Sequence, residues 1–390
     1  MSTITSIKQL INKGYVFYPL EGRGEKNKSL ATLIEGRKNN QKRIALKVSF
    51  NNTTVGRAYD NSLPLEQKIY KHLLGPLVTQ WHTPNILRYF GSFSEPFAEF
   101  RGALSECVVE LDKLLQRAKE KEKRDRKHND IQIRDTKNLK ILGLEYSAAP
   151  TLRKWLQTER SDQELKSVLF QIIYTAECLY RIGIRHNDLH VGNILISSSK
   201  QKKGICYRIN ANQIIAVPTE NTLVKIYDFD NACGMRYKKG RPGCKTVRSV
   251  YYNYKLKYYR YWELYGMSDS DNSKYDTFTI LSSISEIINK YNKNLSLLKL
   301  INENFLKSQE LRSCTWKYVH RMGKKKDGSY FNESQSSLQP DYIPNDNELT
   351  DNNSILNHKT FNEWKIQSNS LKTLHLDKQS SVYIIPNSHI

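Results

Sequence analysis

Two polar side chains five residues apart suggest the chemistry of this chain. Asp188 and Asn193 lie in the segment His-Asn-Asp-Leu-His-Val-Gly-Asn, residues 186–193, and the apolar run Ile194–Ile196 follows it. In phosphoryl transfer, an aspartate of this kind accepts or orients the proton of the acceptor hydroxyl, and an asparagine a turn later binds Mg²⁺. The spacing therefore predicts a loop with Asp188 as the catalytic base and Asn193 as a metal ligand.

A second carboxylate stands at the end of another apolar strand. Residues 223–227 read Leu-Val-Lys-Ile-Tyr, and Asp228 comes directly after them. Mg²⁺ prefers one or two carboxylates together with phosphate oxygens. We therefore predict that Asp228 binds a Mg²⁺ ion that bridges the β- and γ-phosphates of a nucleotide.

The N-terminal part contains groups that could hold the phosphates themselves. Lys47 lies in the apolar run Ile44–Val48, where an ammonium group needs an anionic partner, and Glu66 on the following predicted helix is the natural one. Gly22 and Gly24 lie between two predicted strands and would let backbone N–H groups approach phosphate. Each signal is weak alone. A glycine pair is equally typical of an ordinary hairpin turn, and a single lysine or glutamate is more often a solvated surface residue.

Short apolar runs predict that the first part, residues 1–146, is rich in strands. Residues 14–50 contain three β-branched or aromatic runs separated by Gly, Asn and Lys turns, a pattern typical of an antiparallel meander. A helix is predicted at residues 64–74, and a charged, solvated helix is predicted as an insertion at about residues 108–128. Further strands are predicted at residues 86–92 and 139–146.

The second part, residues 147–320, is predicted to be mainly helical. Ser161 and Glu164 form a capping-box pattern before a helix whose apolar stripe should face the core. A polar stretch at about residues 198–223 interrupts two strands and indicates an insertion.

Composition limits the remaining possibilities. The chain has 390 residues, with 61 Lys+Arg against 39 Asp+Glu and a formal net charge of +22, which attracts polyanions unless the charge is simply solvated. None of the six cysteines shows C-x-x-C spacing, so reduced thiols and a cytoplasmic location are expected. No run approaches the about 18 apolar residues of a membrane span. Residues 321–390 are polar and are expected to form a mobile tail, in which residues 380–385 could dock.

Taken in order, these motifs resemble the signature set of protein kinases. Ile44–Lys47 resembles the V-A-I-K strand, and Glu66 resembles the glutamate that pairs with its lysine. Residues 186–193 resemble the catalytic loop H-R-D-L-x-x-x-N, and Asp228–Asp230 resembles D-F-G. The resemblance to protein kinases covers roughly residues 14–310. The residues of these motifs are also similar to those of the divergent kinases of large DNA viruses.

The resemblance implies an α+β, two-lobed protein-kinase-like fold with an antiparallel sheet in the N-lobe and a mainly helical C-lobe. It implies ATP and Mg²⁺ as cofactors, with adenine bound against a hinge that contains Glu145 and Ser147. Asp276 resembles the buried aspartate that braces the catalytic loop of kinases. The partner it implies is a protein substrate with a Ser or Thr acceptor.

Several residues depart from the kinase pattern. Asn187 replaces an Arg that many kinases use to bind a phosphorylated activation loop, so activation by loop phosphorylation is not expected. His190 stands where Ser/Thr kinases have a Lys that touches the γ-phosphate, and Asp230 replaces the Gly of D-F-G. No A-P-E motif follows, and a segment dense in Tyr and Lys, residues 251–265, takes its place.

These departures leave two alternatives open. The first is a small-molecule kinase of the aminoglycoside- or choline-phosphotransferase type, which His190 and the unusual activation segment favour. The second is a nucleotide-binding scaffold whose basic surface docks on nucleic acid or on a virion component, which Asn187, Asp230 and the sparse glycine loop favour.

Overall fold

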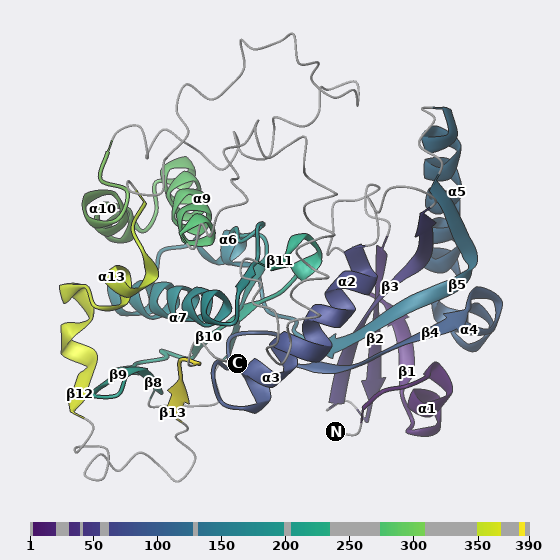
Figure 1. Cartoon of the computed structure of the whole chain (residues 1–390), viewed down its shortest axis with the longest axis horizontal. Coiled ribbons are helices and arrows are strands. Elements are labelled where there is room, and N and C mark those ends of the chain that lie inside the picture. Colours follow the sequence, from purple (N-terminus) through teal and green to yellow (C-terminus); the bar gives the residue numbers. More distant parts are fainter. Residues whose placement is uncertain are drawn as a thin grey trace. The chain divides into compact units, whose positions relative to one another are not determined.

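The computed structural model describes most of the chain as two compact units (Figure 1). The described residues are 3–20, 31–39, 42–54, 62–127, 132–198, 204–234, 274–308, 349–367 and 382–386. The first unit comprises Met1–Pro76 and Leu87–Ser147, and the second comprises Leu77–Ile86 and Ala148–Ile390. An antiparallel sheet dominates the first unit and helices dominate the second, so the predicted α+β class is confirmed.

The sheet of the first unit has five strands in the order β1-β2-β3-β5-β4. Their bounds are Val16–Pro19 (β1), Ala31–Lys38 (β2), Lys42–Thr54 (β3), Tyr89–Pro96 (β4) and Gln132–Glu145 (β5). Every neighbouring pair is antiparallel, and β1 to β3 form the predicted meander. The strand predicted at residues 86–92 begins later, at Tyr89, because Ile86 instead forms an isolated bridge to Ile226 in the second unit.

Helices lie on both faces of this sheet, since Leu46 of β3 belongs to one cluster with Phe100 and Leu111, whereas the adjacent Lys47 pairs with Glu66. The predicted helix at residues 64–74 is α2 (Ser62–Ile69), which continues through a π-helical turn, η1 (Tyr70–Leu74), into α3 (Gly75–Thr79). The sequence did not predict α1 (Ile7–Asn12), α4 (Phe97–Ala103) or the short 3₁₀ turn η2 (Ser105–Cys107).

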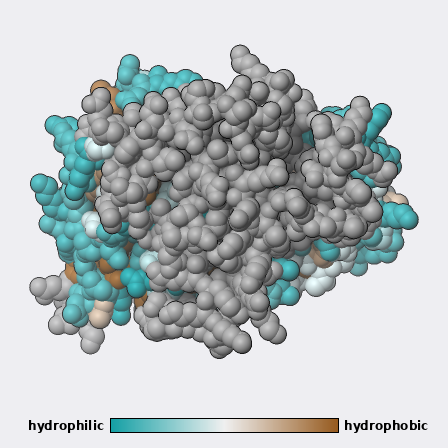
Figure 2. Space-filling model, turned by 45° about the horizontal axis from the view of Figure 1, so that its top comes forward, coloured by the Kyte–Doolittle hydropathy of each residue, from teal (hydrophilic) through white to brown (hydrophobic). Residues whose placement is uncertain are grey.

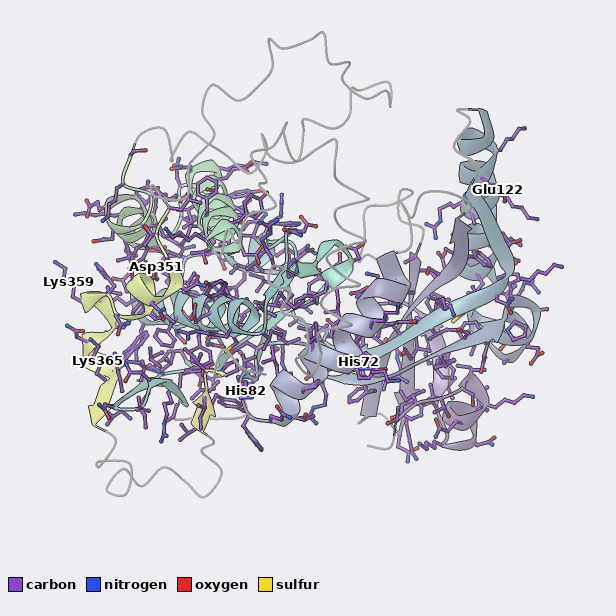
Figure 3. All side chains as sticks on the ribbon, in the orientation of Figure 1. His72, His82, Glu122, Asp351, Lys359 and Lys365 are labelled. Atoms are coloured by element: carbon purple, nitrogen blue, oxygen red, sulfur yellow. The ribbon has the colours of Figure 1, made fainter. Side chains whose placement is uncertain are left out.

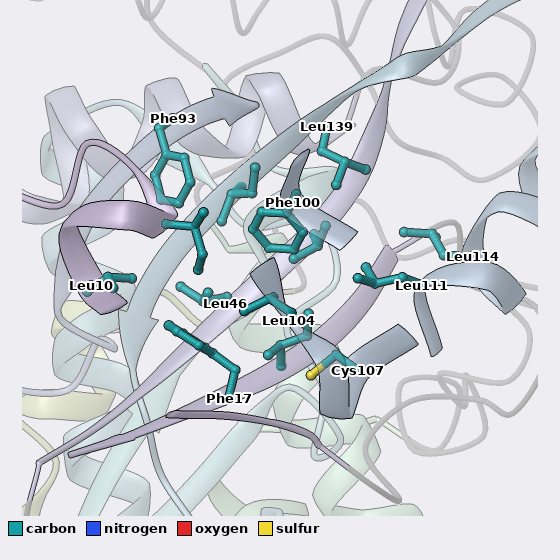
Figure 4. Packing of buried hydrophobic residues seen from close by; sticks show 14 of the residues in the cluster. Leu10, Phe17, Leu46, Phe93, Phe100, Leu104, Cys107, Leu111, Leu114 and Leu139 are labelled. Atoms are coloured by element: carbon teal, nitrogen blue, oxygen red, sulfur yellow. The ribbon is translucent and has the colours of Figure 1, made fainter. Parts of the chain in front are cut away.

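The sequence predicted a solvated, charged helix at about residues 108–128. The helix found there, α5 (Val108–Lys127), is instead amphipathic. Leu111, Leu114 and Ala118 are buried along one of its faces, at 0%, 0% and 2% exposure. Figure 4 shows Leu111 and Leu114 in the hydrophobic cluster that also contains Leu46 of β3 and Phe100 of α4. Helix α5 therefore has a charged face and an apolar face, and the apolar face packs on the sheet.

The longest helix of the second unit is α7 (Asp162–Arg181), and the capping box predicted for it is confirmed. The Ser161 hydroxyl accepts the N–H of Glu164, and the Glu164 carboxylate accepts the N–H of Ser161. Its predicted apolar stripe is buried throughout. The other helices of this unit are α6 (Leu152–Trp155), α9 (Tyr275–Tyr291), α10 (Leu295–Asn304), α13 (Asn352–Leu356) and the 3₁₀ turn η5 (Lys359–Trp364).

Short strands complete the second unit. β6 (Ile184–Arg185) pairs with β11 (Cys233–Gly234), and β7 (Ile194–Ser198) pairs with β10 (Thr222–Ile226). The stretch predicted as an insertion contains a hairpin, β8 (Ile205–Asn210) and β9 (Gln213–Val217).

The described parts of residues 321–390 are packed, in contrast to the mobile tail expected there. β12 (Lys365–Gln367) pairs with β9 and β13 (Val382–Ile384) pairs with β8, which makes a four-stranded sheet in the order β12-β9-β8-β13. Ile355, Leu356 and Phe361 are completely buried. Residues 349–367 and 382–386 therefore belong to the folded second unit.

On the face shown in Figure 2, the described surface is mostly hydrophilic, with small apolar patches. Within the described residues, no helix combines the length and the apolar character needed to cross a membrane.

Candidate active site

The first unit contains the buried ion pair predicted between Lys47 and Glu66. Lys47 Nζ lies 2.8 Å from Glu66 Oε2, and the two side chains are 16% and 1% exposed. The register of the sheet places Lys47 between Leu33 on β2 and Leu142 on β5, so the ammonium group has apolar strand neighbours. A carboxylate as buried as Glu66 requires such a partner.

Helix α2 is fixed to the sheet next to this pair. The Gln67 side chain donates a 3.0 Å hydrogen bond from Nε2 to the carbonyl of Ile141 on β5. Ile69 and Tyr70 are completely buried. The helix that presents Glu66 is therefore held by a polar and an apolar contact.

The end of β5 contains the predicted hinge residues Glu145 and Ser147. The N–H of Glu145 donates to the Arg88 carbonyl at 2.8 Å, and the Glu145 carboxylate accepts the N–H of Arg88 at 3.1 Å. The guanidinium of Arg43 stacks over the ring of Tyr146 at 5.3 Å. The Glu145 N–H is therefore already paired with Arg88. The predicted phosphate-loop residues Gly22 and Gly24 lie outside the described residues.

In the second unit, Asp188 and Asn193 are in direct contact. The Asn193 side chain donates from Nδ2 to the Asp188 carbonyl at 3.0 Å and to Asp188 Oδ2 at 3.2 Å. His190 Nε2 lies 3.5 Å from the other carboxylate oxygen, Oδ1. The Asp188 side chain is 13% exposed as a whole, whereas Oδ1 itself is buried, so the carboxylate is oriented by its neighbours.

A tight turn builds this loop. The N–H of His190 donates to the Asp188 carbonyl at 3.0 Å, and the N–H of Asn193 donates to the His190 carbonyl at 2.9 Å. The Gly192 N–H donates to His190 Nδ1 at 2.9 Å, so the ring proton of neutral His190 sits on Nε2, beside Asp188. Gly192 leaves no room for a side chain, since a Cβ there would lie 2.5 Å from His190 Cε1.

The loop backbone rests on Asp276, as the sequence predicted. The Asp276 carboxylate accepts the N–H groups of His186 and Asn187 at 2.6 and 2.9 Å. Burial raises the pKa of Asp276 above its ordinary value, although His186 and these hydrogen bonds oppose the shift. Asn187 has a positive φ of 64°, and asparagine tolerates this left-handed conformation better than most residues.

His186 is a structural histidine. It is completely buried; its Nδ1 accepts the N–H of Asp188 at 3.3 Å and its Nε2 donates to the Tyr227 carbonyl at 3.0 Å. Its ring packs against Phe229, with centroids 4.5 Å apart. The histidine thus joins the loop of Asp188 to the segment that contains Asp228.

The predicted metal ligands Asn193 and Asp228 lie on adjacent backbone segments. The N–H of Tyr227 donates to the Asn193 carbonyl at 3.1 Å, and the Tyr227 hydroxyl donates to the Gly192 carbonyl at 2.8 Å. Asp228 follows β10 in a left-handed conformation, with φ 67° and ψ 63°. A carboxylate and an amide oxygen are suitable donors for Mg²⁺ with phosphate oxygens.

Sequence reasoning missed a buried polar network that positions β10. Asn85 donates from Nδ2 to Gln171 Oε1 at 2.8 Å and to the Val224 carbonyl at 3.0 Å. The Tyr207 hydroxyl on the β8–β9 hairpin donates to Asn85 Oδ1 at 2.9 Å. The Asn85 carbonyl accepts the N–H of Ile226 at 2.7 Å, two residues before Asp228. The signal in the sequence was Gln171, a polar residue within an otherwise apolar helical stripe.

Together these features define a protein-kinase-like fold: an antiparallel sheet with a lysine–glutamate pair, then a mainly helical unit with a braced Asp–Asn loop and a strand followed closely by an aspartate. No family model matches the chain, and no curated protein matches its sequence. Among solved structures, the chain is similar to a MAP kinase from Leishmania major, with a TM-score of 0.40 and 13% identity over 97% of this chain and 90% of that one. It is also similar to the kinase domain of BubR1, with a TM-score of 0.31 and 13% identity over 55% of this chain and 47% of that one. Since both TM-scores lie below 0.5, we base the function on the chain's own residues.

Proposed function

We propose that this chain is an ATP- and Mg²⁺-dependent phosphotransferase, a protein kinase that transfers the γ-phosphate to a Ser or Thr hydroxyl. The observation that supports this most is the contact between Asp188 and Asn193 on a loop whose backbone is fixed by Asp276. Phosphoryl transfer depends mainly on positioning and charge stabilisation, so a braced loop of this kind suits the reaction.

Each predicted site residue has a role in this proposal. Lys47, held by Glu66, contacts the α- and β-phosphates, and the Glu145–Ser147 segment holds adenine, while Gly22 and Gly24 approach the phosphates. Asn193 and Asp228 would hold Mg²⁺, which would supply positive charge to the nucleotide phosphates.

Asp188 orients the acceptor hydroxyl for in-line attack and takes up its proton. The Asn193 amide fixes the carboxylate through Oδ2, and the side chain as a whole keeps 13% exposure. A general base that is already oriented requires less reorganisation during transfer.

The test is transfer of labelled γ-phosphate to basic and acidic test proteins by wild type and by Asp188→Ala. Loss of a general base lowers the rate by about 10²–10⁴-fold. Asp162→Ala is the matched control, since Asp162 is an exposed aspartate in the first turn of α7. Unchanged transfer by Asp188→Ala would remove Asp188 from this role, and equal loss in both variants would point to misfolding.

A second candidate is a small-molecule kinase of the aminoglycoside- or choline-phosphotransferase type. The observation that favours it is His190, whose Nε2 faces Asp188 where Ser/Thr kinases have a lysine. A metabolite-phosphorylation screen beside the protein assay separates the two candidates. Binding of Mg-ATP in a thermal-shift experiment without any transfer would instead support a nucleotide-binding scaffold.

Two further parts of the proposal, on the related kinases and on the binding partners, are based on the sequence. One is the likeness to kinases of large DNA viruses, with a location in host cytoplasm or in a virion. The other is docking of the basic surface on a polyanion or a virion component, which the net charge of +22 supports. Mass spectrometry of the protein incubated with Mg-ATP and cell extract would report autophosphorylation and the acceptor together.

A further inference from the structure

A residue near the C-terminus reaches the helix that supports the catalytic loop. Asn352, in the first turn of α13, is 4% exposed and makes two side-chain hydrogen bonds. Its Nδ2 donates to Glu177 Oε2 on α7 at 3.2 Å, and its Oδ1 accepts a hydrogen bond from the Thr277 hydroxyl on α9. One amide therefore joins three helices that are far apart in the sequence.

Thr277 is the immediate neighbour of Asp276, the residue on which the loop rests. Both lie in the first turn of α9, and Thr277 is 1% exposed. The Asp276 carboxylate accepts the N–H groups of His186 and Asn187, directly before Asp188. A shift of the first turn of α9 would therefore move the support of the catalytic loop.

Glu177 gives the Asn352 amide its second anchor. The Glu177 side chain is 2% exposed; Oε1 lies 2.6 Å from Arg181 Nε, one turn later, and Oε2 accepts from Asn352. A buried carboxylate is stable only while its oxygens are hydrogen-bonded or paired. Asn352 therefore contributes to the solvation of Glu177 as well as to the position of Thr277.

The rest of the C-terminal segment, Leu349–Gln367, is tied down on both sides of Asn352. On one side, the Thr350 hydroxyl donates to the Phe305 carbonyl at 3.0 Å, after the end of α10. On the other, Phe361 packs edge-on against Phe170 of α7, with centroids 5.1 Å apart, and Lys166 Nζ lies 3.6 Å from Glu363. Figure 3 labels Asp351, Lys359 and Lys365 along this segment. The Asn352 amide is thus presented by an ordered backbone.

We propose that Asn352 is a positioning residue of the catalytic loop: by joining Glu177 to Thr277 it holds the first turn of α9, and with it Asp276, beneath His186 and Asn187. The catalytic consequence rests on the proposed phosphotransferase function. The positioning itself is a property of the fold that can be measured without any activity.

The first experiment compares amide hydrogen exchange at His186 and Asn187 in wild type, Asn352→Ala and Asn353→Ala. Asn353 is an exposed asparagine on the same helix and is the matched control. We expect exchange at these two amides to become about tenfold faster in Asn352→Ala and to stay unchanged in Asn353→Ala. Exchange in β3 of the first unit should not change in either variant.

A second variant tests the same link from the other end. Thr277→Val removes the hydroxyl that donates to Asn352 and keeps the shape of the side chain, so it should accelerate exchange at His186 and Asn187 in the same direction. Both variants remove the same hydrogen bond between Thr277 and Asn352. The acceleration of exchange in the double variant should therefore fall short of the product of the two single accelerations. Thr277→Val also keeps the proposal testable if Asn352→Ala fails to fold.

The kinetic readout is the rate of γ-phosphate transfer. We expect kcat of Asn352→Ala to fall about tenfold with a smaller rise in KM for ATP, since Lys47 and the Glu145–Ser147 segment belong to the first unit. Unchanged exchange at His186 and Asn187 in both Asn352→Ala and Thr277→Val would overturn the proposal, as would equal acceleration throughout the second unit. If wild type transfers no phosphate, the proposed function fails, whereas the exchange result still decides the role of Asn352.

Discussion

Lys47 and Glu66 form a pair in which each residue makes the burial of the other possible. Lys47→Met leaves the carboxylate of Glu66, 1% exposed, without its cation, and removing one partner of a buried pair costs about 3–5 kcal/mol. The double variant Lys47→Met/Glu66→Gln should recover much of this stability, because neither remaining group is charged. Urea unfolding measures the change in the free energy of unfolding.

The same two variants separate stability from activity. We expect phosphate transfer to be lost in the single and in the double variant, since neither retains the ammonium group that would contact the phosphates. Full activity in the stable double variant would show that Lys47 serves only the fold.

Gly192 gives a second prediction at the residue scale. A Cβ at this position would lie 2.5 Å from Cε1 and 2.8 Å from Nδ1 of His190, so Gly192→Ala must displace the ring from Asp188. We expect kcat for phosphate transfer to fall about tenfold with little change in KM for ATP, because an interaction at the reacting group is disturbed. Gly102→Ala is the control, since a Cβ there meets nothing within 4 Å.

The residues that do the proposed chemistry were easier to predict than those that position them. Asp188, Asn193 and Asp228 stand next to apolar strands, so their order and spacing indicate a common site. Asn85 and Asn352 give no such signal, because each is a single polar residue whose partners lie far away in the sequence. Asn187 appeared only as a departure from a motif, whereas its left-handed backbone provides a physical reason for asparagine.

At the scale of elements, helix α13 depends on its N-cap, Asp351. The Ser354 N–H donates to Asp351 Oδ1 at 2.9 Å and the Ser354 hydroxyl donates to Oδ2 at 2.6 Å. Burial alone would raise the pKa of Asp351, but the Ser354 hydrogen bonds and the charge of Lys274 hold it below the ordinary value of 3.8. The charge of Asp351 therefore supports the helix that presents Asn352.

This pKa shift predicts a pH dependence with a definite sign. A carboxyl group whose pKa is lower in the folded state stabilises the fold above its unfolded pKa, and this stability is lost as pH falls through the folded pKa. Asp351→Asn keeps a capping side chain but removes the charge. Its Tm should lie below that of wild type at pH 7, and the gap should close as pH falls below the ordinary value of 3.8. A gap that is constant with pH would mean that the charge does not stabilise the helix.

Element length decided which helices the sequence could predict. α7 spans 20 residues with a capping box, so its periodicity is plain, whereas α1 has 6 residues and α4 has 7. Helices this short have little stability or periodicity of their own. α1 is held by the Ser6 cap and by the burial of Ile7 and Leu10, contacts that only the folded unit supplies.

At the scale of the whole molecule, the C-terminal region was the part least predictable from sequence. Its polar composition indicated a mobile tail, yet β12 and β13 each complete one edge of the β8–β9 hairpin. Two of the few apolar residues of this region, Phe361 and Trp364, pack on Phe170 of α7. A composition average dilutes such anchors among polar neighbours, so it cannot indicate where they dock.

The cysteines provide a probe for each unit. Burial, together with the charges of Glu106 and Glu110, raises the pKa of Cys107 in the first unit to about 12. Burial also raises the pKa of Cys178 and Cys206 in the second unit. Since the thiolate is the reactive form, all three thiols should react slowly with iodoacetamide in the native protein.

Phe361→Ala should change this pattern in the second unit alone. Phe361 is completely buried against Phe170, and truncation of such a side chain costs about 3–5 kcal/mol. We expect Cys178 and Cys206 to be alkylated at least tenfold faster than in wild type, because the C-terminal segment no longer holds α7 and β9, the strand that pairs with β8, while Cys107 stays protected. Mass spectrometry of the labelled peptides gives the three rates, and Asn362→Ala, an exposed neighbour, is the control. Equal acceleration at Cys107 would contradict the prediction, because it would mean that the C-terminal segment supports both units as a single cooperative fold.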